Sequence, residues 1–209
     1  MNTDAPLPDD RAGLWRFHTE ARDGGTKARA GYFDTPHGRV FTPLFMPVGT
    51  NATVKSLLPK ELEAAGARIV LANAYHLARR PGSHVVAALG GLHALMGWRG
   101  PILTDSGGFQ LFSLSRTQGR HVSILEHVDD DGVCLRAADG APMTIKPETS
   151  MEEQRLLGAD VVMAFDECLS DAADVAHARA SMERTHRWLL RCADAWSKRP
   201  CSSQGQPQA

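Results

Sequence analysis

The sequence lacks the features that mark several specialised classes of protein. It has no apolar run of about 18 residues, which excludes a hydrophobic membrane-spanning helix and predicts no membrane partner. Residues 1–13 contain neither a basic segment nor an apolar core, so we expect no secretory signal. The 23 basic residues are balanced by 24 acidic ones, which gives no sign of a basic surface for nucleic acid. A share of 43% hydrophobic and 22% charged residues is typical of a globular domain.

Cysteine is also scarce, and its spacing carries no metal-binding pattern. The four cysteines are Cys134, Cys168, Cys192 and Cys201, and no two of them are separated by two to four residues. We therefore expect reduced thiols, a cytoplasmic location and no metal ligands within this chain.

The chain divides into a short lead, one main domain and a tail. Residues 1–13 predict a disordered lead, and residues 200–209 have the composition of a loop. Within the domain, 14–199, short extended runs broken by glycine-containing turns predict antiparallel hairpins over 14–44. A polar stretch over 116–146 predicts a second, inserted hairpin region.

The remainder alternates buried strands with helices. Apolar runs predict strands over 43–48, 68–72, 101–105 and 160–166, and helices are expected over 59–66, 92–96, 147–157 and 171–198. Because the strands are continuous apolar runs, they predict an α/β fold whose parallel sheet is covered on both faces. Four such units are half of an eight-unit barrel, or alternatively a small open doubly wound sheet.

The last of these helices is long and amphipathic. We expect Asp171 to cap it. Its spacing predicts an inward face of Val175, Ala178, Met182, Thr185, Leu189, Cys192 and Trp196. Three arginines, Arg184, Arg187 and Arg191, are interpreted as a solvated face.

Two strands end in aspartate, Asp105 and Asp166. Ligands of parallel α/β folds bind at the carboxyl ends of strands, where two carboxylates can bind a base, move protons or hold a metal. The alternative is that each aspartate only caps the helix that follows it.

The segment after Asp105 contains several residues that could contact a ligand. Gly107 and Gly108, which follow Ser106, predict a turn whose backbone N–H groups approach a ligand, and Phe109 could lie against a planar ring. The alternative is a tight turn with a core phenylalanine. A serine-protease nucleophile is disfavoured, because that motif belongs to an all-β fold. Two further residues, His76 and Cys168, could face the same end of the sheet. A structural, hydrogen-bonded histidine is the favoured interpretation of His76, and a buried inert thiol is at least as good an interpretation of Cys168.

Several of these segments together resemble a known family. The segments 45–50, 53–55, 75–82, 101–110 and 160–168 resemble, in the same order, the N-terminal half of tRNA-guanine transglycosylases. The run 111–114 is similar to the bacterial branch of that family, the queuine tRNA-ribosyltransferases.

The resemblance implies the first half of a (β/α)8 TIM barrel, preceded by the hairpin region. It implies a transferase of the queuosine pathway that exchanges guanine in the wobble position of tRNA for a 7-deazaguanine by double displacement. By this resemblance Asp105 is the catalytic proton acceptor or donor. The base pocket is lined by Asp105, Ser106, Gly107, Gly108 and Phe109. Asp166 would grip the N–H edge of the base, because a carboxylate accepts two parallel N–H bonds. The implied partners are tRNA with a GUN anticodon loop, 7-aminomethyl-7-deazaguanine and, in the full-length family, a second copy of the enzyme.

The resemblance also has gaps. The family's nucleophilic aspartate, its basic tRNA-binding surface and its Cys3His zinc site have no counterpart in this sequence, and Ala74 stands where the family commonly has threonine. We therefore expect zinc in the full-length family but no cofactor within this chain, and a truncated or split enzyme that is inactive alone. The alternatives are a catalytically inactive half-barrel that binds a partner chain and an unrelated small α/β hydrolase.

Overall fold

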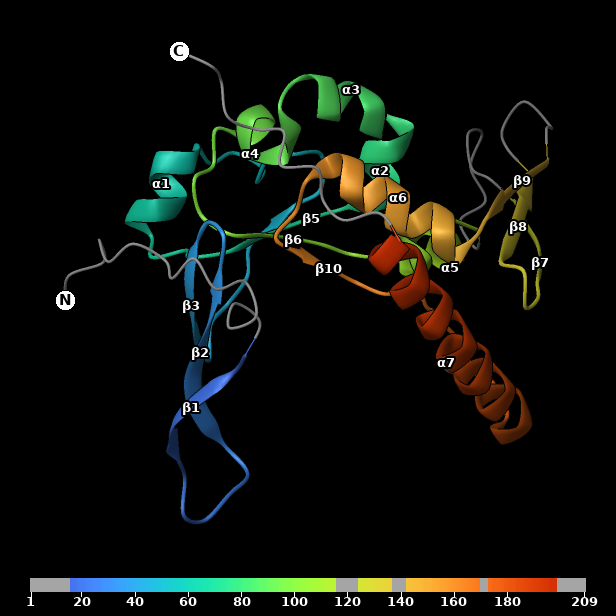
Figure 1. Ribbon diagram of the computed structural model, residues 1–209, viewed down its shortest axis with the longest axis horizontal. Helices are drawn as coiled ribbons and strands as arrows, with labels where there is room; N and C mark the ends of the chain where they lie inside the picture. Colours follow the sequence, from blue (N-terminus) through green and yellow to red (C-terminus); the bar gives the residue numbers. More distant parts are fainter. Residues whose placement is uncertain (1–15, 116–123, 137–141, 170–172, 199–209) are drawn as a thin grey trace.

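A computed structural model describes residues 16–115, 124–136, 142–169 and 173–198 (Figure 1). The expected disordered lead and loop-like tail lie outside the described residues. The first described unit is an antiparallel sheet of β1 (His18–Arg22), β2 (Arg29–Thr35) and β3 (Gly38–Thr42), in that order. This sheet confirms the predicted hairpins, and it projects away from the other elements in Figure 1.

The central sheet is parallel, as predicted, so the fold is mixed α/β. It consists of β4 (Val48–Gly49), β5 (Val70–Ala72), β6 (Ile102–Thr104) and β10 (Val161–Val162). The strand order is β10-β6-β5-β4, and each neighbouring pair is parallel. The carboxyl ends of all four strands therefore lie at the same end of the sheet.

Seven helices are described, and their bounds are α1 (Pro59–Ala64), α2 (Ala74–Arg79), α3 (Ser83–Ala88), α4 (Gly91–Met96), α5 (Gly108–Ser115), α6 (Pro147–Leu157) and α7 (Val175–Lys198). The first begins at the predicted proline, and the Glu61 carboxylate accepts the Leu58 N–H at 2.7 Å. The sequence did not predict α2, α3 and α5, which have six to eight residues and lack the proline start that marked α1. No helix in the described part is both long and apolar enough to cross a membrane.

The two faces of the parallel sheet differ. Val70, Ala72 and Ile102 are fully buried on one face, in a core that they share with Leu77 of α2, Val86 of α3, Leu92 of α4 and Leu157 of α6. The opposite face carries the row Val48, Leu71, Leu103 and Val161, which are paired in register, and Val48 is 52% exposed. The prediction that both faces are covered is therefore wrong for the described residues. A continuous apolar run makes both faces of a strand apolar, but it does not supply what covers them.

The inserted region is a second antiparallel sheet over its described part. Its strands are β7 (Ile124–Val128), β8 (Val133–Arg136) and β9 (Pro142–Ile145), in that order, which confirms the predicted hairpins. Val133 and Leu135 join a second core, in which the rings of Phe165 and Trp188 stack at 5.1 Å.

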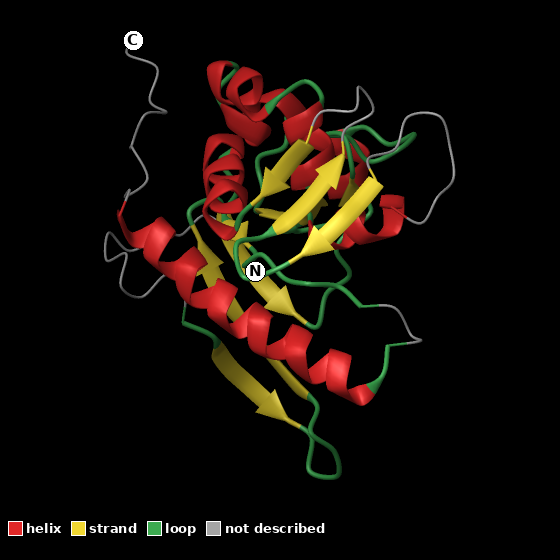
Figure 2. Ribbon diagram, turned by 90° about the vertical axis from the view of Figure 1, so that its right-hand side faces the viewer, coloured by secondary structure: helices red, strands yellow, loops and turns green. Residues whose placement is uncertain are grey.

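The face that the long helix α7 turns inward matches the predicted one only in part. Cys192 is buried as predicted, together with Ser181 and Trp188, whereas Val175, Met182 and Leu189, which were also predicted to face inward, are exposed. The packing of the Trp188 indole decides which face of α7 is buried, because the indole stacks on Phe165 and donates its N–H to the Asp130 carbonyl at 2.9 Å. The predicted cap, Asp171, lies outside the described residues, and the Asp174 carboxylate accepts the His177 N–H instead. Figure 2 shows α7 as the long helix crossing the front of the molecule.

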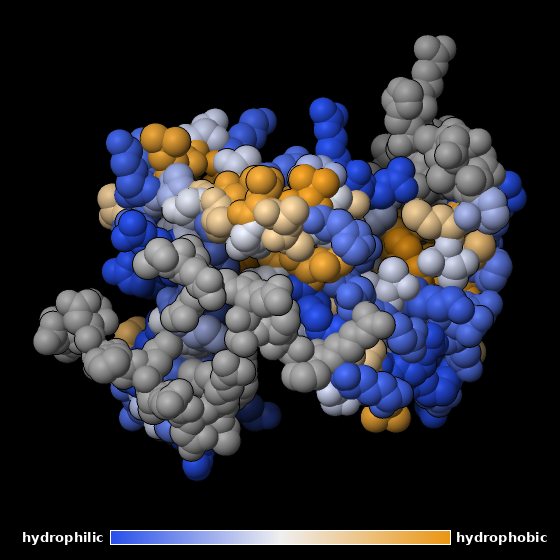
Figure 3. Space-filling view, turned by 45° about the horizontal axis from the view of Figure 1, so that its top comes forward, coloured by the Kyte–Doolittle hydropathy of each residue, from blue (hydrophilic) through white to orange (hydrophobic). Residues whose placement is uncertain are grey.

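Hydrophobic side chains also reach the surface over the helical layer. Figure 3 shows them gathered on the face that carries α3 and α4. Val85, Leu89 and Leu95 belong to this part of the chain and are exposed. Apolar surface in this protein is thus not confined to the open face of the parallel sheet.

Candidate functional site

Asp105 lies where β6 ends, beside the end of β5. Its Oδ2 accepts hydrogen bonds from the side-chain amides of Asn73 (2.6 Å) and Gln110 (3.2 Å), and its Oδ1 accepts the Ala74 N–H (2.9 Å). Because Asn73 and Ala74 directly follow β5, parallel pairing brings these donors to Asp105. The carboxylate is thereby held in one orientation at the edge of the sheet.

The surroundings of Asp105 favour its protonated form. Burial raises the pKa of this carboxyl above its usual value, and the hydrogen bonds from the Ala74 and Gly107 N–H groups and from Gln110 lower it only in part, as does the nearby His76. A carboxyl with a raised pKa can both hold and release a proton closer to neutral pH. His76, considered as a candidate from the sequence, thus influences Asp105 electrostatically, and its backbone N–H donates to Asn73 Oδ1.

The two glycines after Ser106 are required by the geometry of the turn. Gly107 has a φ of +81°, which favours glycine. A Cβ at Gly108 would lie 2.5 Å from the backbone oxygen of Asp166, so no larger residue fits without a shift. Helix α5 begins at Gly108, whose N–H donates to Ser106 Oγ at 3.1 Å. The predicted turn is therefore the start of a helix packed against the end of β10.

Asp166 lies beyond β10 and is bonded to this turn. Its Oδ1 accepts the Ser106 hydroxyl at 2.7 Å, and its Oδ2 accepts the Cys168 thiol at 3.5 Å. Burial, together with the Asp166 charge, raises the pKa of the Cys168 thiol to about 11. Cys168 is therefore a protonated thiol at neutral pH and not a nucleophile.

The two carboxylates share one cavity of about 390 Å³. Its lining combines Asp105, Ser106, Gly107, Phe109 and Gln110 with Met163, Ala164, Asp166, Thr185, His186 and Leu189. Phe109 is 60% exposed, so it is not the core phenylalanine of the alternative interpretation. The Oε1 atom of Gln110 is buried and has no partner in the described part of the chain. The structure thus brings together the sequence-predicted residues Asp105, Ser106, Gly107, Phe109 and Asp166, with Gly108 in the turn between them.

A buried glutamine of α6 fixes the two strand ends to each other. The Gln154 Oε1 atom accepts the Thr104 hydroxyl (3.0 Å) and the Met163 N–H (2.9 Å), while its amide donates to the Met163 carbonyl (2.9 Å). Thr104 precedes Asp105 and Met163 lies three residues before Asp166, so one side chain sets the spacing of both carboxylates. No pattern in the sequence predicted this role for Gln154.

Helix α7 holds the other side of the Asp166 segment through its neighbour, Glu167. The Glu167 N–H donates to Thr185 Oγ1 (3.1 Å), its carbonyl accepts the Ser181 hydroxyl (3.4 Å), and its carboxylate pairs with Arg184. One helix therefore contacts all three polar groups of the residue beside Asp166.

The predicted solvated arginine face needs correction. Arg184 pairs with Glu167, Arg187 with Asp130 and Arg191 with Glu148. The Arg184 side chain is only 20% exposed, because α7 packs this position against the strand end. Helical spacing identified the charged side of α7, but it could not show that carboxylates from other segments lie opposite it.

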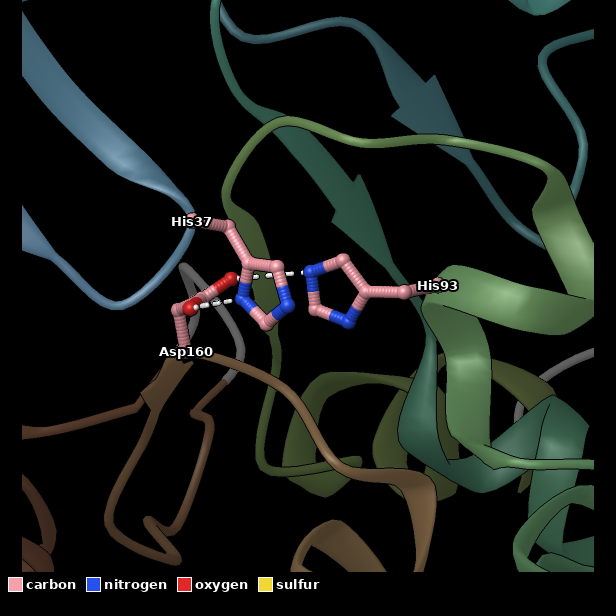
Figure 4. Close-up of side chains that lie close together, drawn as sticks. All are labelled: His37, His93 and Asp160. Carbon is pink, nitrogen blue, oxygen red and sulfur yellow. Dashed lines mark hydrogen bonds and ion pairs between the residues drawn. The ribbon is translucent and has the colours of Figure 1, made fainter. Parts of the chain in front are cut away.

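Three residues that the sequence did not single out form a group at the opposite end of the sheet, where the strands begin (Figure 4). They are His37, His93 and Asp160, and each offers an atom that can bind a metal. Burial raises the pKa of Asp160, but hydrogen bonds from both histidines and from the Ile102 N–H outweigh it and lower that pKa to about 2. Among the described residues no cysteine belongs to such a group. The three residues are far apart in the chain, so no motif spacing could have revealed them.

Comparison with known proteins shows which family this chain matches. The family model described as queuine tRNA-ribosyltransferase matches residues 23–208. The queuine tRNA-ribosyltransferase of Gloeobacter violaceus is 53% identical over 86% of this chain and 45% of its own length, and that of Herpetosiphon aurantiacus is 54% identical over 86% and 43%. The enzyme of the same description from Thermus thermophilus is 50% identical over 87% of this chain and 45% of its own. The chain thus spans under half the length of these curated relatives.

Proposed function

Because the chain belongs to the queuine tRNA-ribosyltransferase family, we propose that it carries part of the active site of a tRNA-guanine transglycosylase. This transferase of the queuosine pathway exchanges guanine at the wobble position of tRNA for a 7-deazaguanine. The observation that carries the proposal is the shared cavity, in which two carboxylates from the segments that follow neighbouring parallel strands flank a glycine turn. A planar base that has N–H groups along one edge and that gains or loses a proton in the reaction needs such carboxylates beside it.

The proposed roles follow from the contacts of each side chain. The Asp166 oxygens, which now accept from a hydroxyl and a weak thiol donor, would accept two parallel N–H bonds from a guanine-type edge, which adenine cannot offer. Asp105, with its raised pKa, would take up or release the proton of the base. Ser106, Gly107, Gly108 and Phe109 would line the base pocket.

We further propose that the parallel sheet is half of a (β/α)8 barrel. The open face with Val48 at its edge supports this, because the inward face of a barrel strand is apolar and is covered by the other strands of the barrel. The domain would run over 14–199. The alternative, an inactive half-barrel that binds a partner chain, is favoured by the same exposed face.

The proposed partners are tRNA with a GUN anticodon loop and 7-aminomethyl-7-deazaguanine, with dimerisation of the full-length enzyme. A tRNA substrate would place the reaction in the cytoplasm. A family zinc site would have to be held outside the described residues, because no described cysteine lies in a group of ligands.

The test is a chimaera in which residues 1–198 are joined to the remaining C-terminal part of the Thermus thermophilus relative. We expect this chain to incorporate labelled guanine into tRNA and to lose that activity on substitution of Asp105 or Asp166. A folded chimaera that binds tRNA without any exchange would favour the inactive half-barrel. Exchange that is indifferent to both substitutions would contradict the proposed roles.

A further inference from the structure

The group of His37, His93 and Asp160 lies at the opposite end of β6 from the proposed reaction. His37 is in the turn between β2 and β3, His93 is in α4, and Asp160 immediately precedes β10. The Asp160 carboxylate also accepts the N–H of Ile102, the first residue of β6. Asp105 lies past the opposite end of the same strand. The group therefore belongs to the amino-terminal edge of the sheet, which the base-binding cavity does not use.

The side chains of this group converge on the buried carboxylate. His37 Nδ1 lies 2.7 Å from Asp160 Oδ1, and His93 Nε2 lies 3.0 Å from Asp160 Oδ2. The two imidazole rings are stacked, with their centroids 3.6 Å apart. Figure 4 shows the rings next to each other beside the Asp160 carboxylate. The Asp160 side chain is 1% exposed, His93 is 15% exposed and His37 is 42% exposed. The group is thus anchored on a buried carboxylate and reaches solvent at His37.

We propose that His37, His93 and Asp160 bind a divalent transition-metal ion of the Zn²⁺ type, at a site separate from the base-binding cavity. Two imidazole nitrogens and one carboxylate oxygen are a donor set that suits Zn²⁺, Co²⁺ or Ni²⁺ and not Mg²⁺ or Ca²⁺, which prefer oxygen alone. Three protein ligands leave a fourth position, which water would fill on the solvent side of His37.

The geometry allows this with small movements. The three ligand atoms lie within 4.8 Å of one another. In a tetrahedral site with bonds of about 2.1 Å, neighbouring ligand atoms are about 3.4 Å apart. The stacked rings must rotate to aim both lone pairs at one point, and His37, half exposed in a turn, has room to do so. Each neutral imidazole keeps one proton, which moves to its other ring nitrogen and so frees the nitrogen that faces Asp160 to bind the ion.

Binding would also change the charge balance of this edge. Among the described residues, the buried Asp160 carboxylate accepts hydrogen bonds from both histidines and from the Ile102 N–H, and a bound cation would neutralise its charge directly. Because the ligands come from the β2–β3 turn, from α4 and from the start of β10, the ion would tie the N-terminal sheet to the central sheet. It would therefore stabilise the folded chain, since a ligand that binds only the folded state raises the melting temperature.

The test uses the full 209-residue chain without an affinity tag, treated with a chelator and dialysed. Titration with ZnCl₂ in a calorimeter should show one saturable equivalent, and ZnCl₂ should raise the melting temperature where MgCl₂ does not. CoCl₂ should give the visible absorption of tetrahedral Co²⁺.

His37→Ala should weaken Zn²⁺ binding at least about tenfold. His84→Ala is the matched control, because His84 is an exposed histidine on α3 outside the group, and it should bind as the parent chain does. His37 is half exposed, so its variant should fold even if the buried Asp160→Asn variant does not. Absence of saturable binding, or equal binding by His37→Ala and the parent chain, would overturn the proposal. The three residues would then be a hydrogen-bonded group that binds no metal.

Discussion

The hydroxyl of Ser106 donates a hydrogen bond to Oδ1 of Asp166 at 2.7 Å, across 60 residues of sequence. The Ser106 hydroxyl oxygen in turn accepts the N–H of Gly108, the first residue of α5. One hydroxyl thus joins the glycine turn after β6 to the carboxylate after β10. The two loops that carry the proposed chemistry are therefore held as a unit before any base binds.

Asp105→Asn should abolish most base exchange in the chimaera. The amide keeps the shape of the carboxylate but cannot take up a proton, and loss of a general acid or base costs about 10²–10⁴-fold in rate. The measurement is incorporation of labelled guanine into tRNA, with Asp194→Asn on the exposed side of α7 as the control. A near-normal rate in Asp105→Asn would remove Asp105 from the mechanism.

Asp166→Ala should weaken binding of the free base more than binding of tRNA. Hydrogen bonds to a charged group are worth about 1.5–3 kcal/mol each, and the alanine loses the oxygens that would accept both N–H groups. The KM for the base and the Kd for tRNA are measured separately. Ser106→Ala, which leaves the carboxylate in place, should have a smaller effect on the base. If only the tRNA affinity changes, the role assigned to Asp166 is wrong.

The raised pKa of Asp105 predicts a specific pH dependence of stability. The folded chain binds this proton more tightly than the unfolded chain, whose carboxyl titrates near 3.8. The contribution of Asp105 to stability is therefore present at low pH and is lost as the pH rises through the folded-state value. Relative to the parent chain, Asp105→Asn should become more stable as the pH increases above about 4. Urea unfolding of both chains over a pH series measures this, and a difference with the opposite slope would contradict it.

Two arginines on successive turns of α7 should differ in importance. Arg184→Ala leaves the Glu167 carboxylate, 8% exposed, without its cation and should cost about 2 kcal/mol or more in the free energy of unfolding. Arg187→Ala removes an exposed pair with Asp130 and should cost about 0–1 kcal/mol. In the chimaera, Arg184→Ala should also raise the KM for the base, because Glu167 adjoins Asp166. Equal losses of stability in the two variants would show that Arg184 does not hold the strand end.

The open face of the parallel sheet should make the isolated chain self-associate. Val48 is exposed at one edge of the sheet, and Met163 follows β10 at the other. Exposed apolar patches and strand edges of this kind drive association. Sedimentation velocity should show species larger than a monomer, and Val48→Lys should reduce their share. A strictly monomeric parent chain at high concentration would refute this expectation.

The sequence by itself determined the local chemistry of this protein. A run of apolar residues closed by aspartate and two glycines requires a buried strand followed by a tight turn, and the structure has β6 and the start of α5 there. The turns of the N-terminal hairpins and the turn at Asp131 and Gly132 were equally predictable, because glycine at a turn is a local requirement. The family followed from motifs that are each continuous in the chain.

Only the tertiary structure decided which groups meet. Helical spacing allowed Met182 and Leu189 to face inward, but the packing of Trp188 on Phe165 rotated α7 so that Ser181, Thr185 and Arg184 hold Glu167. His37 and Asp160 are separated by 123 residues, and nothing local records their contact. Backbone conformation depends on neighbours in sequence, whereas such contacts depend on how strands and helices pack, and packing energy is shared among many distant side chains.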